Sequence, residues 1–285
     1  MKIIRVFPRK TSMTPNDSMS FVGLPKFNLW RPPADEVHVS VTFTWDIEYG
    51  KYLRDAWAQY YDAVRIGGPA IGDCPNGFIP GRYVKPGVTF TTRGCDNRCP
   101  WCLVPKREGK LKEIRNFAPG HIIQDNNILQ ASKRHLRDVA EMLHTQSKAA
   151  VFSGGIQASL VDTWVSCWFE GLRIKEIFLA ADTSGALPAL RRAVDKLEFL
   201  GRNSNKLRCY VMIGYNGETI DEATSRLEAV WNAGCVPFAQ LYQPDDCYIE
   251  YSREWKALAR TWSRPAAIRA LHKDTGSRIT NPMGL

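Results

Sequence analysis

The sequence predicts an α/β protein in which parallel strands alternate with helices, and three observations support this fold class. Short β-branched or apolar runs recur after residue 87, separated by longer segments with helical periodicity. Helix punctuation falls between these runs, with Pro188 near one helix start and Gly234 at another helix end. Hydrophobic residues make up 44% of the chain and charged residues 24%, as in globular proteins. This alternation favours a parallel sheet or a barrel.

Residues 1–86 predict a small N-terminal α/β unit and a linker. Residues 37–43 (VHVSVTF) alternate and are β-branched, which is typical of a strand. A helix is expected over residues 48–61, and the short apolar run AVRIGG follows it, so the segment has the size of one βαβ unit. Two stretches rich in polar residues, Pro or Gly are expected to be irregular connections: 14–36 and 73–86.

Residues 87–250 predict the main domain, and residues 251–285 a basic helical C-terminal tail. Six strands are expected in the main domain, at 88–92, 149–152, 157–160, 176–182, 207–214 and 236–242. Helices are expected between them, at 135–145, 164–169, 187–200 and 218–233. The tail is expected to begin as a helix over 252–262 and to end in Gly and Pro.

Composition limits the cellular setting and the partners. No apolar run reaches the roughly 18–20 residues that a membrane-spanning helix needs, and the N-terminus MKIIRVFPRK does not resemble a signal peptide. We therefore expect a cytoplasmic protein with no membrane partner. The formal net charge of +9 is compatible with a polyanionic partner such as a nucleic acid, and equally with a well-solvated basic surface.

Three of the eight cysteines fall within one short window, which is the strongest functional signal in the chain. Residues 92–105 read TRGCDNRCPWCLVP, so Cys95, Cys99 and Cys102 have Cys-x3-Cys-x2-Cys spacing directly after a predicted strand. Three thiolates on one loop can bind three irons of a cubane cluster and leave the fourth iron open for a substrate. Trp101 adds an aromatic face that can pack on a flat ring.

A zinc site is the main alternative for these cysteines. Zinc needs a fourth ligand, and the nearest following histidine is His121. Zinc ribbons also use two Cys-x2-Cys pairs, whereas this loop has one. A zinc-stabilised, non-catalytic nucleic-acid-binding protein therefore stays open as a second hypothesis.

The motif CDNRCPWC resembles the cluster loop of the radical S-adenosylmethionine (radical SAM) superfamily, and the similarity extends over roughly residues 87–250. Superfamily members have a partial (β/α)6 barrel with the cluster loop after the first strand. Gly154 and Gly155 occupy the place of the Gly-Gly pair that receives the methionine amino group, although Ile156 and Gln157 stand where an acidic residue is common. Asp182 matches the polar residue that holds the ribose, and Gly214 begins a segment similar to the Gly-x-Pro-Gly-Glu-Thr turn.

This resemblance implies a 4Fe–4S cluster held by the three cysteines and oxygen-sensitive chemistry. The cluster would bind S-adenosyl-L-methionine and cleave it reductively to a 5′-deoxyadenosyl radical, which abstracts a hydrogen atom from a substrate. Trp101 would flank the adenine. The resemblance also implies a reducing partner such as a flavodoxin or a ferredoxin.

Two further resemblances are partial. The N-terminal unit, with VRIGGP after a strand and a helix, looks like a remnant of cobalamin-binding domains, but it lacks the Asp-x-His-x-x-Gly signature and we expect no cobalamin. The stretch CLVPKREGK is loosely similar to methylthiotransferases, whose second cluster needs three N-terminal cysteines. This chain has only Cys74 before residue 95, so a methylthiotransferase-like enzyme fits poorly.

The substrate is the least constrained part of the prediction. Three stretches carry the positive excess: 105–115, 191–208 and 253–278. The first directly follows the cysteine loop and is a candidate for gripping phosphate, with a solvated loop as the alternative. An anionic substrate, nucleic acid or nucleotide among the candidates, is compatible with this pattern. The sequence assigns no role to five cysteines: Cys74, Cys167, Cys209, Cys235 and Cys247.

Overall fold

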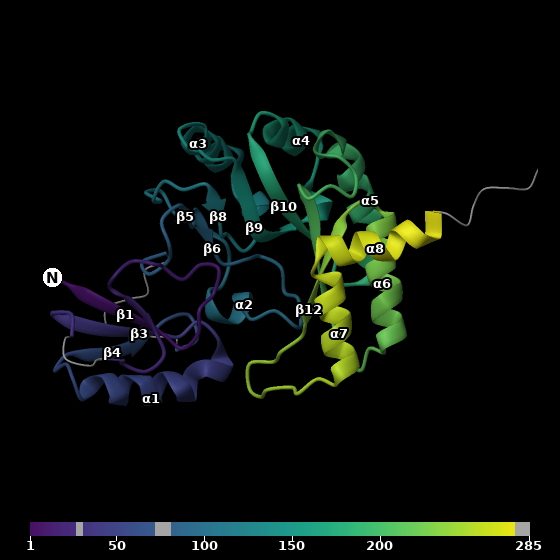
Figure 1. Cartoon of the computed structure of the whole chain (residues 1–285). Coiled ribbons are helices and arrows are strands. Elements are labelled where there is room, and N and C mark those ends of the chain that lie inside the picture. The colour runs from purple at the N-terminus through teal and green to yellow at the C-terminus, as the bar shows by residue number, and fades with distance from the viewer. Residues whose placement is uncertain (27–30, 72–80, 277–285) are drawn as a thin grey trace, which may run out of the picture. The chain divides into compact units, whose positions relative to one another are not determined.

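The computed structural model describes residues 1–26, 31–71 and 81–276, and the chain divides into two compact units (Figure 1). The smaller unit comprises residues 1–90 together with 244–248, and the larger unit begins at Thr91 and holds the rest. Each unit contains parallel strands and helices, so the predicted α/β class is confirmed.

The smaller unit is a four-stranded parallel sheet covered by one helix. Its strand order is β2-β1-β3-β4, with bounds Ser20–Val22, Ile3–Phe7, Glu36–Ser40 and Val64–Gly67. Helix α1 (Ile47–Ala58) packs against β3 and β4 and buries Leu53 and Trp57. The predicted strand–helix–strand segment is therefore present. Strands β1 and β2 were not predicted, and β2 interrupts the stretch 14–36 that was expected to be irregular.

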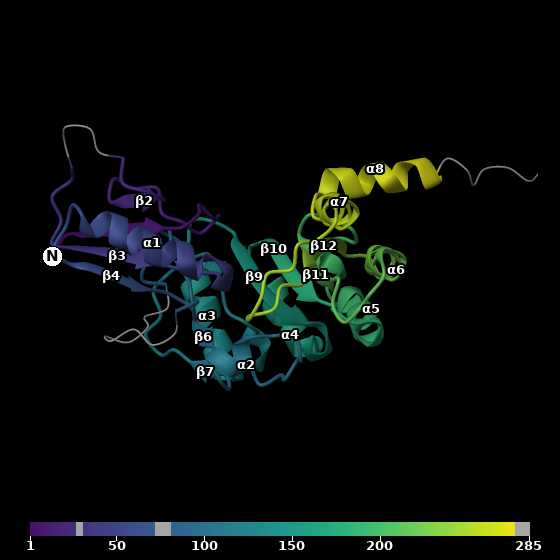
Figure 2. The same cartoon turned by 90° about the horizontal axis from the view of Figure 1, so that it is seen from below.

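The larger unit contains a second parallel sheet. Five of its strands lie side by side in the order β12-β11-β10-β9-β8, with bounds Val236–Leu241, Leu207–Ile213, Ile174–Ala180, Ala150–Gln157 and Ile122–Ile123. Four helices alternate with the strands: α3 (Lys133–His144), α4 (Thr163–Glu170), α5 (Leu187–Lys196) and α6 (Ile220–Asn232). Figure 2 shows these elements from below.

Local sequence signals set the starts of these helices. The side chains of Ser132 and Asp162 accept the amide hydrogens of His135 and Val165, which caps α3 and α4. Thr219 starts α6 with a reciprocal capping box. Because parallel strands buried on both faces need apolar residues throughout, the core is dominated by side chains of β9 to β12 and the helices that cover them.

The C-terminal tail forms two helices. Helix α7 (Arg253–Trp262) packs against β12 and α6, and α8 (Pro265–Gly276) packs against α7. Figure 1 shows both helices in yellow. The sequence predicted a helical tail and placed its first helix at 252–262, but it gave no separate bounds for α8. Among the helices of the described residues, none combines the length and apolar character needed to cross a bilayer.

Two predicted strands differ from the structure, and one strand was not predicted. The predicted strand at 157–160 is wrong, because β9 extends through Gln157 and residues Ala158–Leu160 form a 3-10 turn. Strand β8 was missed because it has only two residues. The single strand expected at 88–92 is split into β5 (Val88–Thr89) and β6 (Thr92–Arg93).

Two short elements follow the cysteines. Helix α2 (Val104–Arg107) comes directly after them, and β7 (Lys112–Glu113) returns to pair antiparallel with β6. The cysteines therefore lie in a long loop whose two ends are held together by the pairing of β6 with β7.

Candidate functional site: the cysteine loop

Residues 94–102, which we call the cysteine loop, carry the three clustered thiols. Cys95, Cys99 and Cys102 are free and partly buried. The amide of Cys102 donates to the carbonyl of Cys99 at 3.0 Å, which closes a tight turn between them. At the start of the loop, Gly94 has a φ of +81°, and a Cβ there would lie 2.2 Å from the carbonyl oxygen of Lys110. Only glycine fits this close approach.

Glu108 ties the start of the cysteine loop to the returning chain. Its carboxylate accepts hydrogen bonds from the Arg93 guanidinium, the Gly94 amide at 3.0 Å and the Asn126 side-chain amide at 2.6 Å. The ion pair with Arg93 is largely buried, with 18% and 21% of the two side chains exposed. Charge-assisted bonds of this kind are the stronger class of hydrogen bond, so Glu108 fixes the loop base.

Asp125 is buried and fixes the residues that precede the cysteine loop. Its side chain accepts the amides of Thr91 and Thr92 at 2.7 and 3.0 Å and the hydroxyl of Thr91, which also contacts His135 Nε2 at 3.1 Å. Burial raises the pKa of the Asp125 carboxyl, and these hydrogen bonds oppose the rise. The carboxyl thus holds the two residues that lead into β6 and the cysteine loop.

An amide network joins the cysteine loop to the carboxyl end of β9. Asn97 donates to the side-chain oxygen of Gln157 at 2.9 Å, and Asn127 donates to the same oxygen at 3.1 Å. Gln130 accepts the amide of Asp96 at 2.8 Å and donates to Asn97 at 3.2 Å. These contacts place the loop at the edge of the sheet where β9 ends, which is the edge that carries ligand sites in parallel α/β folds.

Trp101 extends the site to the ends of β10 and β11. Its ring lies 5.5 Å from the ring of Tyr215 in an edge-on arrangement, and Tyr215 lies 4.9 Å from Tyr242 in the same way. Trp101 also lies close enough to Asp182 to lower the pKa of its carboxyl, and this carboxylate accepts the Met212 amide at 2.9 Å. The structure therefore brings the predicted residues Trp101 and Asp182 together.

Burial raises the pKa of Asp182, while the Met212 amide, the Arg226 charge and Trp101 oppose that rise. The charge of this carboxylate contributes to the raised pKa of Cys99 and Cys102. For both thiols burial is the largest cause of the rise.

Arg226 supports the strand ends behind Asp182. It is buried on α6, donates to the carbonyls of Asp182 and Met212 at 2.8 Å each, and pairs with Glu218. Glu218 in turn accepts the amide of Gly214 at 2.8 Å. Gly214 has a φ of +78°, and a Cβ there would lie 2.8 Å from the Tyr251 ring. The turn after β11 therefore requires glycine at position 214, one of the residues predicted for the site.

Gly154 and Gly155 lie inside β9, not after it. Phe152 pairs with Ile177 and Ile156 pairs with Leu179, so two extra residues bulge out of the strand between them. A Cβ on Gly154 would lie 1.5 Å from the Asp125 carbonyl oxygen, whereas one on Gly155 would meet Ala180 at 3.5 Å. Gly154 is therefore required by backbone contact with the Asp125 segment.

The donor set can be tested for fit to a cluster. Among the described residues, no three His, Cys, Asp or Glu side chains are close enough to ligate one ion. A cubane cluster spreads its thiolates over three irons, so three separate thiols on one loop fit it chemically.

Four of the other five cysteines lie within the described residues. Cys209 and Cys235 are fully buried, and burial raises the pKa of both. Cys167 and Cys247 are exposed. Cys74 lies outside the described residues.

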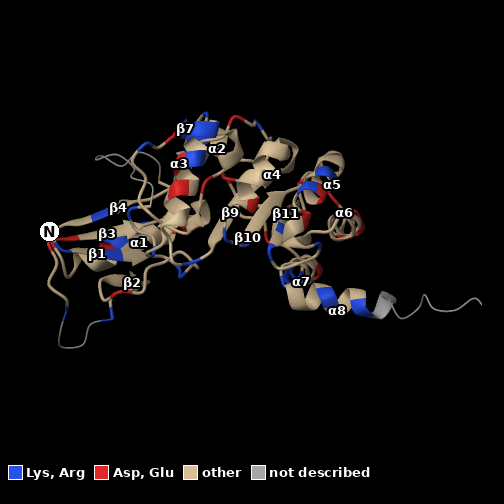
Figure 3. Ribbon diagram, turned by 90° about the horizontal axis from the view of Figure 1, so that it is seen from above, with Lys and Arg blue, Asp and Glu red and all other residues tan. Residues whose placement is uncertain are grey.

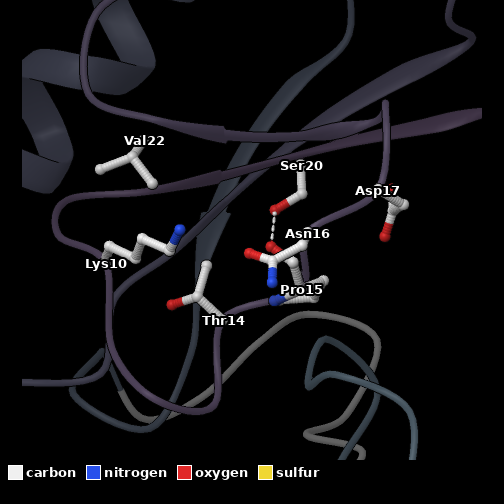
Figure 4. Close-up of a pocket in the computed structure, with 7 residues that line it drawn as sticks. All are labelled: Lys10, Thr14, Pro15, Asn16, Asp17, Ser20 and Val22. Atoms are coloured by element: carbon white, nitrogen blue, oxygen red, sulfur yellow. Dashed lines mark hydrogen bonds between the residues drawn. The ribbon is translucent and has the colours of Figure 1, made fainter.

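Two cavities accompany these elements. One, of about 460 Å³, lies beside the cysteine loop and is lined by Cys95, Asp96, Arg98, Pro105, Gly109 and Lys110. The other, of about 420 Å³, belongs to the smaller unit and is lined by polar residues around Lys10 and Thr14. Figure 4 shows the second cavity, in which the Ser20 hydroxyl donates to the Pro15 carbonyl at 3.0 Å.

Sequence reasoning missed the residues that hold the loop: Glu108, Asp125, Gln157 and Arg226. The partners described above lie between 8 and 60 positions away along the chain, so no local spacing reveals them. One signal was present, since Glu218 belongs to the turn segment that resembled the superfamily motif.

Comparison of the chain with models of known protein families and with curated proteins finds no match.

Proposed function

We propose that the protein is a radical SAM enzyme whose cysteine loop holds a 4Fe–4S cluster. The observation that carries the proposal is the association of three free thiols with Trp101 and Asp182 at one edge of a parallel sheet. Thiols supply the ligand type that such a cluster needs, and three of them leave one iron open. The fold then belongs to the partial (β/α)6 barrels, with β9 to β12 among its strands.

The protein's own residues would bind and orient the cofactor. Trp101 offers an aromatic face for the adenine, held by its contact with Tyr215. Asp182 offers a carboxylate to the ribose, while its bond to the Met212 amide fixes its orientation. The bulge at Gly154 and Gly155 frees backbone groups of β9 from regular sheet pairing, which makes them available to the methionine end.

When bound, the cluster and S-adenosylmethionine would supply reductive carbon–sulfur cleavage and a 5′-deoxyadenosyl radical. The chain's part is to position the reacting groups and to exclude competing reactions. A partly buried loop serves this purpose because it limits the access of water and oxygen to the thiols. The electron would come from a flavodoxin or ferredoxin in the cytoplasm.

Anaerobic reconstitution tests the proposal. The protein is incubated with iron and sulfide, and iron and zinc contents and the visible spectrum are recorded. Dithionite and S-adenosylmethionine are then added, and 5′-deoxyadenosine is quantified. We expect about four irons per chain and 5′-deoxyadenosine formation that the Cys99→Ala variant lacks.

A matched control separates loss of the ligand from loss of a thiol in general. Cys167→Ala removes an exposed cysteine outside the loop, and we expect it to retain the cluster and the activity. Colourless protein that takes up one zinc per chain would reject the iron–sulfur proposal. An iron–sulfur protein that binds S-adenosylmethionine but yields no 5′-deoxyadenosine, with or without nucleic acid, would reject the enzymatic part.

A further inference from the structure

Five exposed cations lie in the cysteine loop and in the segment that follows it. We call them the basic rim: Arg98, Arg107, Lys110, Lys112 and Arg115. All five are exposed, and none of them makes an ion pair within the part of the chain that the structure describes. Figure 3 shows this concentration of basic residues in blue over α2 and β7.

The acidic residues of the same segment are used to build the loop. Glu108 binds Arg93, Gly94 and Asn126, as described above. Asp96 accepts the amide of Leu111 at 3.1 Å, and Glu113 accepts the amide of Ser132 at 2.6 Å. Hydrogen bonding to Ser132 is the largest cause of the lowered pKa of Glu113. The carboxylates therefore bind groups outside the basic rim, and the rim cations are left to the solvent.

The cavity beside the loop gives two of these cations a common target. Arg98 and Lys110 both line it, together with Cys95 and the open backbone at Gly109, where a Cβ would meet nothing within 4 Å. At about 460 Å³ the cavity has room for a phosphate and the groups attached to it. Because Cys95 also lines the cavity, an anion bound there would lie beside the proposed cluster.

The other two basic stretches are engaged within the fold to a greater extent. In the stretch 191–208, Arg202 pairs with Asp195 and Arg208 pairs with Glu176. In the tail, Arg269 donates to Asn203 and Asn205. The positive excess of the sequence is thus most available to a ligand at the basic rim.

We propose that the basic rim binds the phosphodiester backbone of a nucleic acid and presents it to the cysteine loop as substrate. The role of the nucleic acid as substrate rests on the proposed function, whereas its binding to the basic rim does not. Only two of the five cations line the cavity, so a single phosphate would leave the rest unused. A chain of phosphates can engage cations spread along residues 98–115.

Salt dependence measures the number of rim contacts. The full chain is titrated into a labelled single-stranded oligonucleotide of about 20 nucleotides, and anisotropy gives the dissociation constant between about 50 and 200 mM salt. Five phosphate contacts predict that log K falls with log salt at a slope of roughly −3.5, which weakens binding roughly 100-fold over this range.

Two double variants test the assignment to the rim. Arg98→Gln with Lys110→Gln removes the cations that line the cavity, and Lys112→Gln with Arg115→Gln removes two cations outside the cysteine loop. Each pair is expected to reduce the steepness of the slope by about 1.4. The matched control, Lys175→Gln with Arg192→Gln, removes two exposed cations from β10 and α5 and is expected to leave the slope unchanged.

The outcomes separate this proposal from the proposed function. Replacement of Cys95, Cys99 and Cys102 by Ala is expected to abolish 5′-deoxyadenosine formation but to leave the salt slope within about 0.7 of the wild-type value. The rim proposal is overturned if both rim variants retain the wild-type slope, or if the control pair loses as much. It is also overturned if inorganic phosphate or a mononucleotide competes as well as the oligonucleotide at equal phosphate concentration.

Discussion

Adjacent glycines in β9 allow a sharp test of how the strand supports the cysteine loop. In Gly154→Ala the new Cβ would lie 1.5 Å from the Asp125 carbonyl oxygen, whereas in Gly155→Ala it would lie 3.5 Å from Ala180. Heavy atoms pack best at about 3.5–4.0 Å, so Gly154→Ala forces one backbone to move by roughly 2 Å. Neither glycine has a positive φ, so Ala is otherwise compatible with both positions.

The cost follows from what Asp125 holds. Overpacking costs about 1–3 kcal/mol, and each lost hydrogen bond to a charged group costs about 1.5–3 kcal/mol. Since Asp125 binds Thr91 and Thr92, we expect Gly154→Ala to lower the free energy of unfolding by about 3–5 kcal/mol. Gly155→Ala should change it by less than about 1 kcal/mol.

Urea unfolding followed by tryptophan fluorescence gives both free energies. Hydrogen exchange of the β9 and β10 amides locates the loss in the larger unit. The steric argument is refuted if the two variants are equally stable, or if Gly154→Ala is the more stable one. The argument about Asp125 is refuted if Gly154→Ala is destabilised but the amides of Thr91 and Thr92 keep their wild-type protection.

Three further predictions concern the residues around the loop. Burial raises the folded pKa of Asp125 above its unfolded value, so this carboxyl makes stability fall as pH rises from the unfolded pKa through the folded one. Asp125→Asn should remove this fall of stability with pH. Free energies of unfolding measured between pH 4 and 8 should then stay constant or rise with pH in the variant. Arg226→Leu leaves the Glu218 carboxylate buried without its partner and should cost about 3–5 kcal/mol, while Arg226→Leu with Glu218→Gln should cost less; a double-mutant cycle in urea that shows simple additivity would contradict this. Gly94 and Gly109 both have a positive φ, +81° and +74°, so Ala is strained at either position. Only Gly94→Ala also meets a main-chain carbonyl, at 2.2 Å, so iron bound after reconstitution should drop further in Gly94→Ala than in Gly109→Ala.

The order of strands and helices could be predicted because the spacing of apolar residues within each short segment indicates its type. Strands β10, β11 and β12 are mostly apolar, and α6 has a capping box at its start, so each signal lies within a few residues. Strand β8 could not be found in the same way. Its two residues gain their identity from pairing with Val151 and Phe152, which no window around Ile122 contains.

The candidate site likewise combines a feature visible in the sequence with contacts that only the fold creates. The spacing of Cys95, Cys99 and Cys102 is local and visible in the sequence, whereas the groups that hold the loop are brought together by the fold. Gln157 lies 60 positions from Asn97, and only the end of β9 brings their side chains to 2.9 Å. Sequence reasoning noted Gln157 as a departure from the superfamily pattern, and the structure gives that residue a contact of its own.

The bulge in β9 explains why a Gly-Gly pair can interrupt a buried strand without reversing its faces. Side chains alternate with a period of two, so a single extra residue would turn the following side chains to the opposite face. Two extra residues preserve the alternation, and Phe152 and Ile156 accordingly remain on the buried face, each only 1% exposed. The strand therefore keeps its core packing while its end advances to where Gln157 meets the cysteine loop. A sequence window that stops the strand at Phe152 misses this, because the glycines end the apolar run but not the pairing.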